Sequence, residues 1–334
     1  MNRKPASALA TALLASLALA LGACGEKEDT LTSPEPEPID LALDFFVNPD
    51  HAGIYMALER GYFDQAGLDV RPRVPSDPSA PIREVAAGRA DLAISYEPEV
   101  LLAREQGLDV IAVAALVDEP LTSLISLPAA GIAEPADLRG KTIATAGIPY
   151  QAAYLSTILR EAGLTSEDVN EVNVGFNLLP AVLSGRAEAM LGGFRNVEGV
   201  DLRLRGERPR VVPVDRIGVP TYDELVVVAE GSRVEDDPNQ IRLFLAALAK
   251  GTADAVADPA AATEVILAAG EGLDPRLTRA EIDATLPFLA AEEGKPYGEM
   301  DSDEWETFAS WMSGNGLISE VPPTDEMLTN DLLP

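Results

Sequence analysis

Residues 86–94 read AAGRADLAI, and residues 183–191 read LSGRAEAML. Both stretches have the form of a helix end, a Gly-Arg-Ala turn, an acidic residue and a short apolar run. A glycine that ends a helix before a buried strand is a typical signal of a helix-to-strand connection. Because the unit occurs twice, we predict two equivalent halves; the alternative is a chance recurrence of common connecting sequence.

Around these two units, short apolar runs alternate with helical stretches. The predicted strands lie at 41–46, 68–74, 91–95, 110–116, 142–144, 172–176, 187–191, 210–214 and 224–229. The predicted helices lie at 53–60, 81–87, 98–106, 150–162, 178–184, 198–204, 238–256, 259–269, 279–289 and 302–313. Strands and helices of these lengths in alternation predict an α/β fold with mostly parallel sheets.

The first 24 residues, MNRKPASALATALLASLALALGAC, have the pattern of a secretory signal. A short positive start precedes an apolar run at 8–21, which is short for a membrane-spanning helix. Residues 21–24 resemble the lipobox of bacterial lipoproteins, in which the chain is cut before a cysteine that becomes lipidated. We therefore predict a lipoprotein signal peptide over 1–23 and lipidation of Cys24. An uncleaved anchor and an ordinary secretory signal are the alternatives.

Residues 24–38 are polar and acidic and end in the alternating sequence PEPEP. Alternating prolines favour an extended, semi-rigid spacer. We predict that this segment is a tether that holds a folded domain off the cell membrane, at its extracytoplasmic face.

The chain has 334 residues, of which 55 are acidic and 25 basic, a formal net charge of −30. This balance opposes nucleic-acid binding, which needs lysine and arginine partners for phosphates. It also opposes a polybasic membrane-binding patch. Solubility, adaptation to salt and steering of a cationic ligand are the interpretations that remain.

Cys24 is the single cysteine of the sequence and His51 the single histidine. These counts exclude an internal disulfide, a thiolate cluster and a histidine-rich metal site. No phosphate-binding loop, dinucleotide-binding glycine motif or nucleophile elbow occurs in the sequence. We therefore expect no cofactor, no metal and no catalytic residue.

The stretch LDFFVNPDHAGIY at 43–55 continues into GYF at 61–63 and GLDV at 67–70. This unit resembles the binding proteins for thiamine pyrimidine precursors, a family that also includes fungal enzymes that make the pyrimidine. The resemblance covers nearly all of residues 40–315, and its first motif is specific to the family. It implies a two-lobed, periplasmic-binding-protein-like (type II) α/β fold with a ligand cleft between the lobes.

The resemblance implies a lobe one of residues 40–118 plus 225–330 and a lobe two of 125–215, joined near 116–127 and 214–225. It also implies a function, that of a binding protein of an ABC importer. Such a monomeric protein delivers hydroxymethylpyrimidine or formylaminopyrimidine to a permease and an ATPase.

The sequence departs from the family in two ways. Many relatives carry tryptophan at the position of Phe45, and phenylalanine lacks the indole donor. Riboflavin or another flat heterocycle therefore remains an alternative ligand. The enzyme branch carries a cysteine-rich iron motif and uses a cofactor lysine, whereas this chain has only Cys24. We therefore expect a binding protein rather than a pyrimidine synthase.

An aminopyrimidine needs aromatic faces to stack on, a carboxylate for its amino group and donors for its ring nitrogens. The motifs place residues of these types at predicted strand ends. The candidates are Phe45, Tyr96, Tyr150, Phe194 and Tyr222 for stacking, Glu198 and then Glu97 as acceptors, and Asn48, His51 and Asn196 as polar contacts. For Phe45 and Tyr222 the alternative is a role in packing. For His51 the alternative is a position at the start of a helix without ligand contact, and for Glu198 it is a solvent-exposed charge on a helix.

Overall fold

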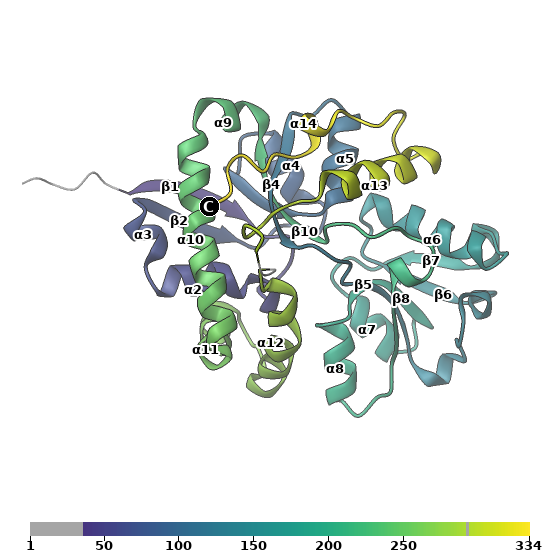
Figure 1. The fold of residues 1–334 in the computed structure, drawn as a ribbon. Coiled ribbons are helices and arrows are strands. Elements are labelled where there is room, and N and C mark those ends of the chain that lie inside the picture. Colours follow the sequence, from purple (N-terminus) through teal and green to yellow (C-terminus); the bar gives the residue numbers. More distant parts are fainter. Residues whose placement is uncertain (1–35, 292–293) are drawn as a thin grey trace, which may run out of the picture. The chain divides into compact units, whose positions relative to one another are not determined.

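The computed structural model describes residues 36–291 and 294–334. The predicted signal peptide, Cys24 and most of the predicted tether lie outside these described residues. Within them, the strands form two five-stranded sheets, and each sheet with its helices is called a lobe below. Figure 1 shows the two groups of strands, with β1, β2, β4 and β10 in one group and β5 to β8 in the other.

The two sheets have the same arrangement of strands. The order in lobe one is β2 (Leu68–Arg73), β1 (Glu37–Ala42), β3 (Leu92–Ser95), β10 (Leu225–Glu230) and β4 (Val110–Val117). The order in lobe two is β7 (Asn170–Asn173), β6 (Thr142–Thr145), β8 (Ala189–Phe194), β5 (Thr122–Ser126) and β9 (Arg210–Pro213). Each sheet is parallel at β2-β1-β3 or β7-β6-β8 and contains one antiparallel strand, β10 or β5. The expected mostly parallel sheets are therefore mixed, because each receives one strand that arrives from the other lobe.

The repeated Gly-Arg-Ala unit lies at equivalent places, before β3 and before β8. Its glycine has a left-handed backbone in both copies, with φ of 63° and 71°. The carboxylate of Asp91 accepts the N–H of Asp40 at 2.7 Å, and that of Glu188 accepts the N–H of Thr142 at 2.8 Å. The acidic residue of each unit thus fixes the start of its strand against the neighbouring parallel strand.

Helices cover both sheets. Those of lobe one are η1 (Pro49–His51), α2 (Ala52–Glu59), α3 (Tyr62–Gln65), α4 (Ala80–Ala86), α5 (Glu97–Glu105), α9 (Gly231–Asp236), α10 (Pro238–Ala257), α11 (Pro259–Ala269), α12 (Pro275–Leu289), α13 (Ser302–Gly314) and α14 (Thr324–Met327). Those of lobe two are η2 (Pro128–Ala130), η3 (Pro135–Leu138), α6 (Pro149–Glu161), η4 (Ser166–Asp168), α7 (Leu178–Leu183), α8 (Glu198–Leu204) and η5 (Val214–Arg216).

Three successive helices, α10, α11 and α12, begin with an Asp-Pro pair. The aspartates are Asp237, Asp258 and Asp274, and each side chain accepts a backbone N–H of the first turn. Proline at the first helical position lacks an N–H that would have no partner there, and its fixed φ suits a helix. The pair therefore sets where α12 begins, which matters for the cavity described below.

The chain passes between the lobes at residues 118–121 and 214–224. The first connection is shorter than the expected 116–127, because β4 runs to Val117 and β5 begins at Thr122. Strand β1 begins at Glu37, inside the predicted tether of 24–38. Proline has no backbone N–H to donate to a neighbouring strand. Pro38 is tolerated because β3 pairs only with Leu41 and Ala42 of β1, so no hydrogen bond to β3 is lost at Pro38.

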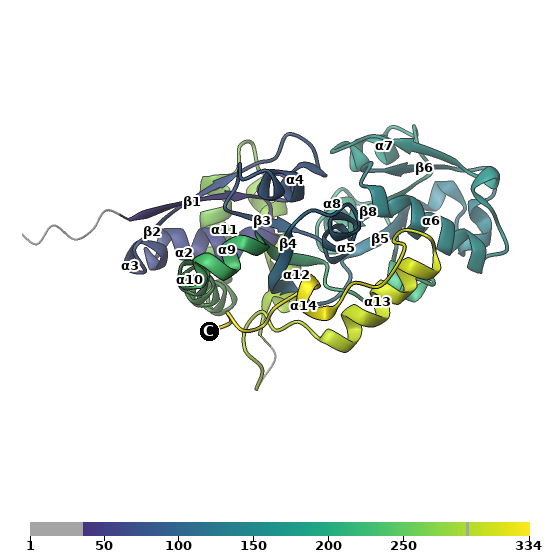
Figure 2. The ribbon, with the colours of Figure 1, turned by 90° about the horizontal axis from the view of Figure 1, so that it is seen from above.

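The C-terminal segment contacts both lobes. In α13, the rings of Phe308 and Trp311 lie 6.5 and 5.8 Å from that of Tyr154 in α6 of lobe two. Further on, Leu328 pairs with Ala112 of β4 in a short parallel bridge. Figure 1 and Figure 2 both show the yellow helix α13 beside α5 and α6.

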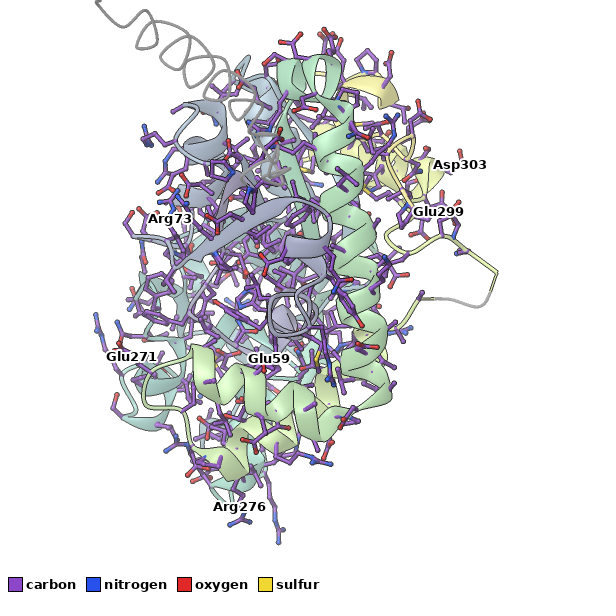
Figure 3. All side chains as sticks on the ribbon, turned by 90° about the vertical axis from the view of Figure 1, so that its left-hand side faces the viewer. Glu59, Arg73, Glu271, Arg276, Glu299 and Asp303 are labelled. Carbon is purple, nitrogen blue, oxygen red and sulfur yellow. The ribbon has the colours of Figure 1, made fainter. Side chains whose placement is uncertain are left out.

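Charged side chains lie on the outside of the described chain. Figure 3 shows Glu271, Arg276 and Asp303 projecting away from the ribbon, and all three are exposed. Among the described residues, we find no helix with both the length and the apolar character needed to cross a membrane.

Helices α2 and α10 cross at two glycines. A Cβ atom added to Gly251 would lie 2.3 Å from the carbonyl oxygen of Gly53 and 2.6 Å from the Cβ of Ala57. These distances are far below van der Waals contact, so the crossing requires a residue without a side chain at this point. It holds α2, and with it the preceding η1, in place.

We expect Gly251→Ala to lower the free energy of unfolding by about 1–3 kcal/mol, because the added methyl group forces the two helices apart. Gly314→Ala, at the end of α13, is the matched control because its Cβ would meet nothing within 4 Å. Urea unfolding followed by circular dichroism measures both. Equal midpoints for the two variants would contradict the close crossing.

Candidate ligand-binding site

A cavity of about 210 Å³ lies where the carboxyl ends of strands from both lobes meet. Its walls come from residues 44–49 after β1, Tyr96 after β3, residues 146–151 after β6 and the end of β8. Helix α12 closes another side with Leu277, Thr278 and Glu281. Ligands of open α/β sheets bind at this edge of the strands, so the cavity is the candidate site.

Aromatic rings from both lobes surround the cavity. Phe45 and Phe46 of lobe one lie 4.6 and 4.5 Å from the ring of Phe176 in lobe two, measured between ring centroids. Deeper in, the rings of Tyr96 and Tyr150 make a second contact between the lobes at 5.9 Å. These edge-to-face and tilted contacts join the two lobes, and Phe45, Phe46, Tyr96 and Tyr150 also line the cavity.

Asp44, which lines the cavity, is held by two neighbours. Its Oδ1 lies 2.8 Å from Nε2 of His51, and its Oδ2 accepts the hydroxyl of Tyr96 at 3.0 Å. The backbone N–H of Asn48 donates to Nδ1 of His51 at 3.3 Å, so the proton of a neutral ring lies on Nε2 and points to Asp44. His51 is fully buried and orients this carboxylate from behind.

Glu198 is the cavity carboxylate that lobe two provides. It begins α8, where its Oε2 accepts the backbone N–H of Phe194 at 2.7 Å. Burial raises the pKa of Glu198 above its usual value, and that hydrogen bond lowers it in part. The carboxylate is thus fixed in direction and can accept from a ligand that carries an amino group.

Six of the ten predicted ligand-binding residues line the cavity. They are Phe45, Asn48, Tyr96, Tyr150, Phe194 and Glu198. They lie together because each lies at the end of a strand, in the segment that follows one, or at the start of a helix, at the same edge of its sheet.

The other four predicted residues, His51, Glu97, Asn196 and Tyr222, do not line the cavity. His51 supports Asp44 from behind, as described above. The carboxylate of Glu97 accepts the backbone N–H of Asp223 at 2.7 Å. Asn196 joins the lobes instead, because its side chain donates to Asp50 Oδ1 at 2.7 Å and to Thr285 Oγ1 at 2.8 Å.

Tyr222, the last of these four, supports the connections between the lobes. Its hydroxyl donates to Glu224 at 3.0 Å, and its ring lies 5.0 Å from that of Phe308. Tyr222 was predicted to stack on the ligand, with a packing role as the alternative. The structure places it in the packing role.

Sequence reasoning did not find several residues of the cavity. Asp44 and Phe46 lie inside the motif at residues 43–55, and Gln151 directly follows the candidate Tyr150. Their positions next to predicted site residues could have indicated that they also line the site. Glu281 lies on α12, in a helical stretch without a motif, and nothing local in the sequence marks it. The remaining such residues are Val47, Pro49, Thr122, Ala146, Ile148, Leu178, Gly192, Val197, Leu273, Leu277 and Thr278.

A buried carboxylate joins the two chain connections. Glu224, at the end of residues 214–224, accepts the backbone N–H groups of Leu121 and Thr122, both at 2.7 Å. The hydroxyls of Thr122 and Tyr222 donate to it at 2.8 and 3.0 Å. Burial raises the pKa of Glu224 to about 7, although these four hydrogen bonds act in the opposite direction.

Among the described residues, no group of three or more histidine, aspartate or glutamate side chains is arranged to hold a metal ion.

A family model described as NMT1/THI5 like matches residues 48–262. The formylaminopyrimidine-binding protein of Halalkalibacterium halodurans is 35% identical over 288 residues, which cover 85% of this chain and 87% of that protein. The chain belongs to the NMT1/THI5-like family. A 4-amino-5-hydroxymethyl-2-methylpyrimidine phosphate synthase of Aspergillus parasiticus is also similar, at 28% identity over 68% of this chain and 69% of that enzyme.

Solved structures agree with the fold of this NMT1/THI5-like protein. The alkanesulfonate-binding protein of Xanthomonas axonopodis superposes with a TM-score of 0.68 at 15% identity, covering 87% of this chain and 96% of that chain. The two-lobed periplasmic-binding-protein fold predicted from the sequence is thereby confirmed. At this identity the likeness concerns the fold alone.

We expect the protein to lose stability as pH rises from 5 to 8. A carboxyl group with a raised pKa binds its proton more tightly in the folded chain than in the unfolded chain. The stabilisation is therefore complete below about pH 4.5 and is lost as pH rises through the folded value, about 7 for Glu224. Melting temperatures across this range measure the slope.

Glu224→Gln has the same shape as glutamate, so it fits among the same four neighbouring groups, but it does not titrate. The melting temperature of this variant should therefore fall less steeply with rising pH than that of the wild type. The difference should amount to about 1–3 kcal/mol of stability across the range. The exposed Glu59→Gln is the control for the loss of one negative charge. Identical slopes for Glu224→Gln and the wild type would refute the assignment.

Proposed function

We propose that the protein is the extracytoplasmic solute-binding lipoprotein of an ABC importer, and that it binds hydroxymethylpyrimidine or formylaminopyrimidine, precursors of thiamine. The observation that carries this proposal is the small cavity between the lobes, which combines aromatic faces with the fixed carboxylate of Glu198. The formylaminopyrimidine-binding relative, at 35% identity, supports the same ligand class.

The cavity offers the complement of an aminopyrimidine. The rings of Phe45 and Phe194 supply apolar faces, and the carboxylate of Glu198 can accept from the amino group. Two donors remain for ring nitrogens. The Tyr150 hydroxyl makes no hydrogen bond within the described residues, and Gln151 uses only its oxygen, to accept the N–H of Ala146.

The size of the cavity favours a single ring over riboflavin, the alternative ligand. Its volume of about 210 Å³ is below the range of about 300–1,000 Å³ that is typical for sites of drug-sized ligands. A three-ring flavin with a ribityl chain would need a larger space than a substituted pyrimidine. Riboflavin therefore remains a control ligand in the binding experiment below.

Binding rather than synthesis is the activity that the chain supports. The synthase relative from Aspergillus parasiticus is less similar, at 28% identity, than the binding protein at 35%. The chain also lacks the cysteines of the enzyme branch, because Cys24 is its single cysteine. We propose that it acts as a monomer that passes its ligand to a permease and ATPase complex.

The two connections at 118–121 and 214–224 form the proposed hinge between lobe one (40–118 plus 225–330) and lobe two (125–215). Glu224 binds both connections at one point, so the lobes can rotate about it without separating there. Opening would break the Asn196 bonds to Asp50 and Thr285 and would admit the ligand.

A ligand screen by thermal shift tests the proposal. Hydroxymethylpyrimidine and formylaminopyrimidine, at 100 times their dissociation constants, should each stabilise the protein by about 2.7 kcal/mol, whereas thiamine and riboflavin should not. A shift with riboflavin alone would replace the ligand but keep the receptor. No shift with any of the four would refute the proposed ligand.

Glu198→Gln should weaken pyrimidine binding at least tenfold in calorimetry, because the amide is neutral and presents a donor where the ligand needs an acceptor. Glu207→Gln, an exposed substitution just beyond α8, is the matched control and should bind like the wild type. Equal affinities for the two variants would remove Glu198 from the site.

Cys24→Ser should move the protein from the membrane fraction to the soluble fraction of its host and abolish incorporation of labelled fatty acid. The reason is that a serine side chain offers no sulfur for lipidation. Loss of the acyl chains removes about 0.8 kcal/mol of membrane binding for each CH₂ group that they bury. An unchanged membrane fraction would show that another segment anchors the chain.

A further inference from the structure

Glu281 faces the cavity from α12, on the same side of that helix as Leu277 and Thr278. Residues three and four positions apart share one side of a helix, so the Asp274 cap that begins α12 also sets the direction of Glu281. The side chain comes from lobe one, whereas Glu198 comes from lobe two.

The Glu281 carboxyl group lacks a partner. The residue is 7% exposed, yet within the described chain its carboxyl group makes no hydrogen bond. Its oxygens are not among the side-chain atoms that are both fully buried and unpaired, so they open into the cavity. A largely buried carboxyl group in this position either keeps its proton or binds a ligand. Because Glu281 lines the cavity, the possibility that its carboxyl group binds a ligand can be tested directly.

Burial is the main cause of the raised pKa of Glu281, and the charged groups that add to it are all acidic. Glu198 and Asp201 face it from α8, and Asp50 faces it from η1. Helices α10 and α11 and strand β4 also pack against α12 and add no charged group to this set among the described residues. On α12 itself, Arg279 pairs with Asp283 at the surface.

We propose that Glu281 is a second ligand-binding carboxylate, which binds the heterocycle from the opposite lobe to Glu198. The two carboxylates would take the edge formed by the amino group and the adjacent ring nitrogen, and the proton of Glu281 would pass to that nitrogen. This inference rests on the proposed function, because it names the part of the pyrimidine that the site recognises.

The protons balance in this arrangement. Burial and the neighbouring acids raise the pKa of Glu281 to about 8, so near pH 7 the group holds a proton in the closed protein. On binding, the O–H bond of Glu281 breaks and an N–H bond forms on the ligand, with no net uptake from solution. The product is a cationic ring between two carboxylates, which removes their mutual repulsion.

Above pH 8, Glu281 is ionised before the ligand arrives, and binding must then take one proton from solution. The dissociation constant should therefore rise towards tenfold per pH unit above 8. A pyrimidinone, which presents a carbonyl in place of the amino group, should bind poorly above pH 8, where it offers an acceptor to two ionised carboxylates.

The test is calorimetry of hydroxymethylpyrimidine with the full chain between pH 6.5 and 9. For Glu281→Gln we expect at least tenfold weaker binding at pH 7 and a nearly flat profile up to pH 9. Glu281→Asp should restore part of the pH dependence, and Glu271→Gln, an exposed substitution shortly before α12, should match the wild type. Melting temperatures confirm that each variant is folded.

Wild-type affinity and pH profile in Glu281→Gln would overturn the inference and leave the proposed function intact. Failure of the wild type to bind either pyrimidine would instead overturn the proposed function. Benzamidinium, a cation with the same two-nitrogen edge, then probes the carboxylates directly. Its binding to the wild type and loss in Glu281→Gln would support the paired site, and its failure to bind the wild type would overturn both proposals.

Discussion

The contact between Glu224 and the backbone of Leu121 and Thr122 is the constraint from which the rest of the site follows. Each lobe receives one strand from the other, β10 in lobe one and β5 in lobe two, and these strands begin where the two connections end. Because the carboxylate binds one connection and belongs to the other, both strands enter their sheets from a common point. The carboxyl ends of the parallel strands in the two lobes consequently face the same space.

That space is rich in buried acidic groups. Asp44 has its hydrogen-bond partners, whereas Oδ2 of Asp50 is buried without one, and burial and the nearby Asp44 raise the pKa of Asp50 well above its usual value. Glu198 and Glu281 add to the same field. Protein interiors avoid such clusters unless protons, cations or donors offset the repulsion. The charges at the cavity therefore select for a ligand that brings hydrogen-bond donors.

The sequence predicted the architecture because local signals agreed with the global fold. The Gly-Arg-Ala unit marks the start of β3 and β8, and the Asp-Pro pairs mark the starts of three helices. Strand β5 was missed as a strand because residues 122–126 pair only with β8 and β9, which lie much later in the chain. No local pattern distinguishes such a segment from an extended connection.

The same reasoning applies to the site. Residues in the segments that follow strands, such as Phe45 and Glu198, were predictable because strand ends gather at one edge of a sheet. Glu281 was not, since only the packing of α12 against η1 and α8 brings it to the cavity. Asn196 precedes Glu198 by two residues, but its side chain donates to Asp50 and Thr285 of lobe one instead of lining the cavity.

The polar contacts between the lobes link closure to protonation. The Asn196 amide donates to Asp50 of the other lobe, and the rings of Tyr96 and Tyr150 make a further contact between the lobes. Opening would return Asp50, Glu198 and Glu281 to water, which lowers the cost of their ionised forms. Protons on these groups would therefore favour closing without a ligand, and donors on a bound ring would favour closing in the same way. A ligand that supplies hydrogen-bond donors to these carboxyl groups would stabilise the closed form over the open form, and this difference in affinity would drive the proposed closure.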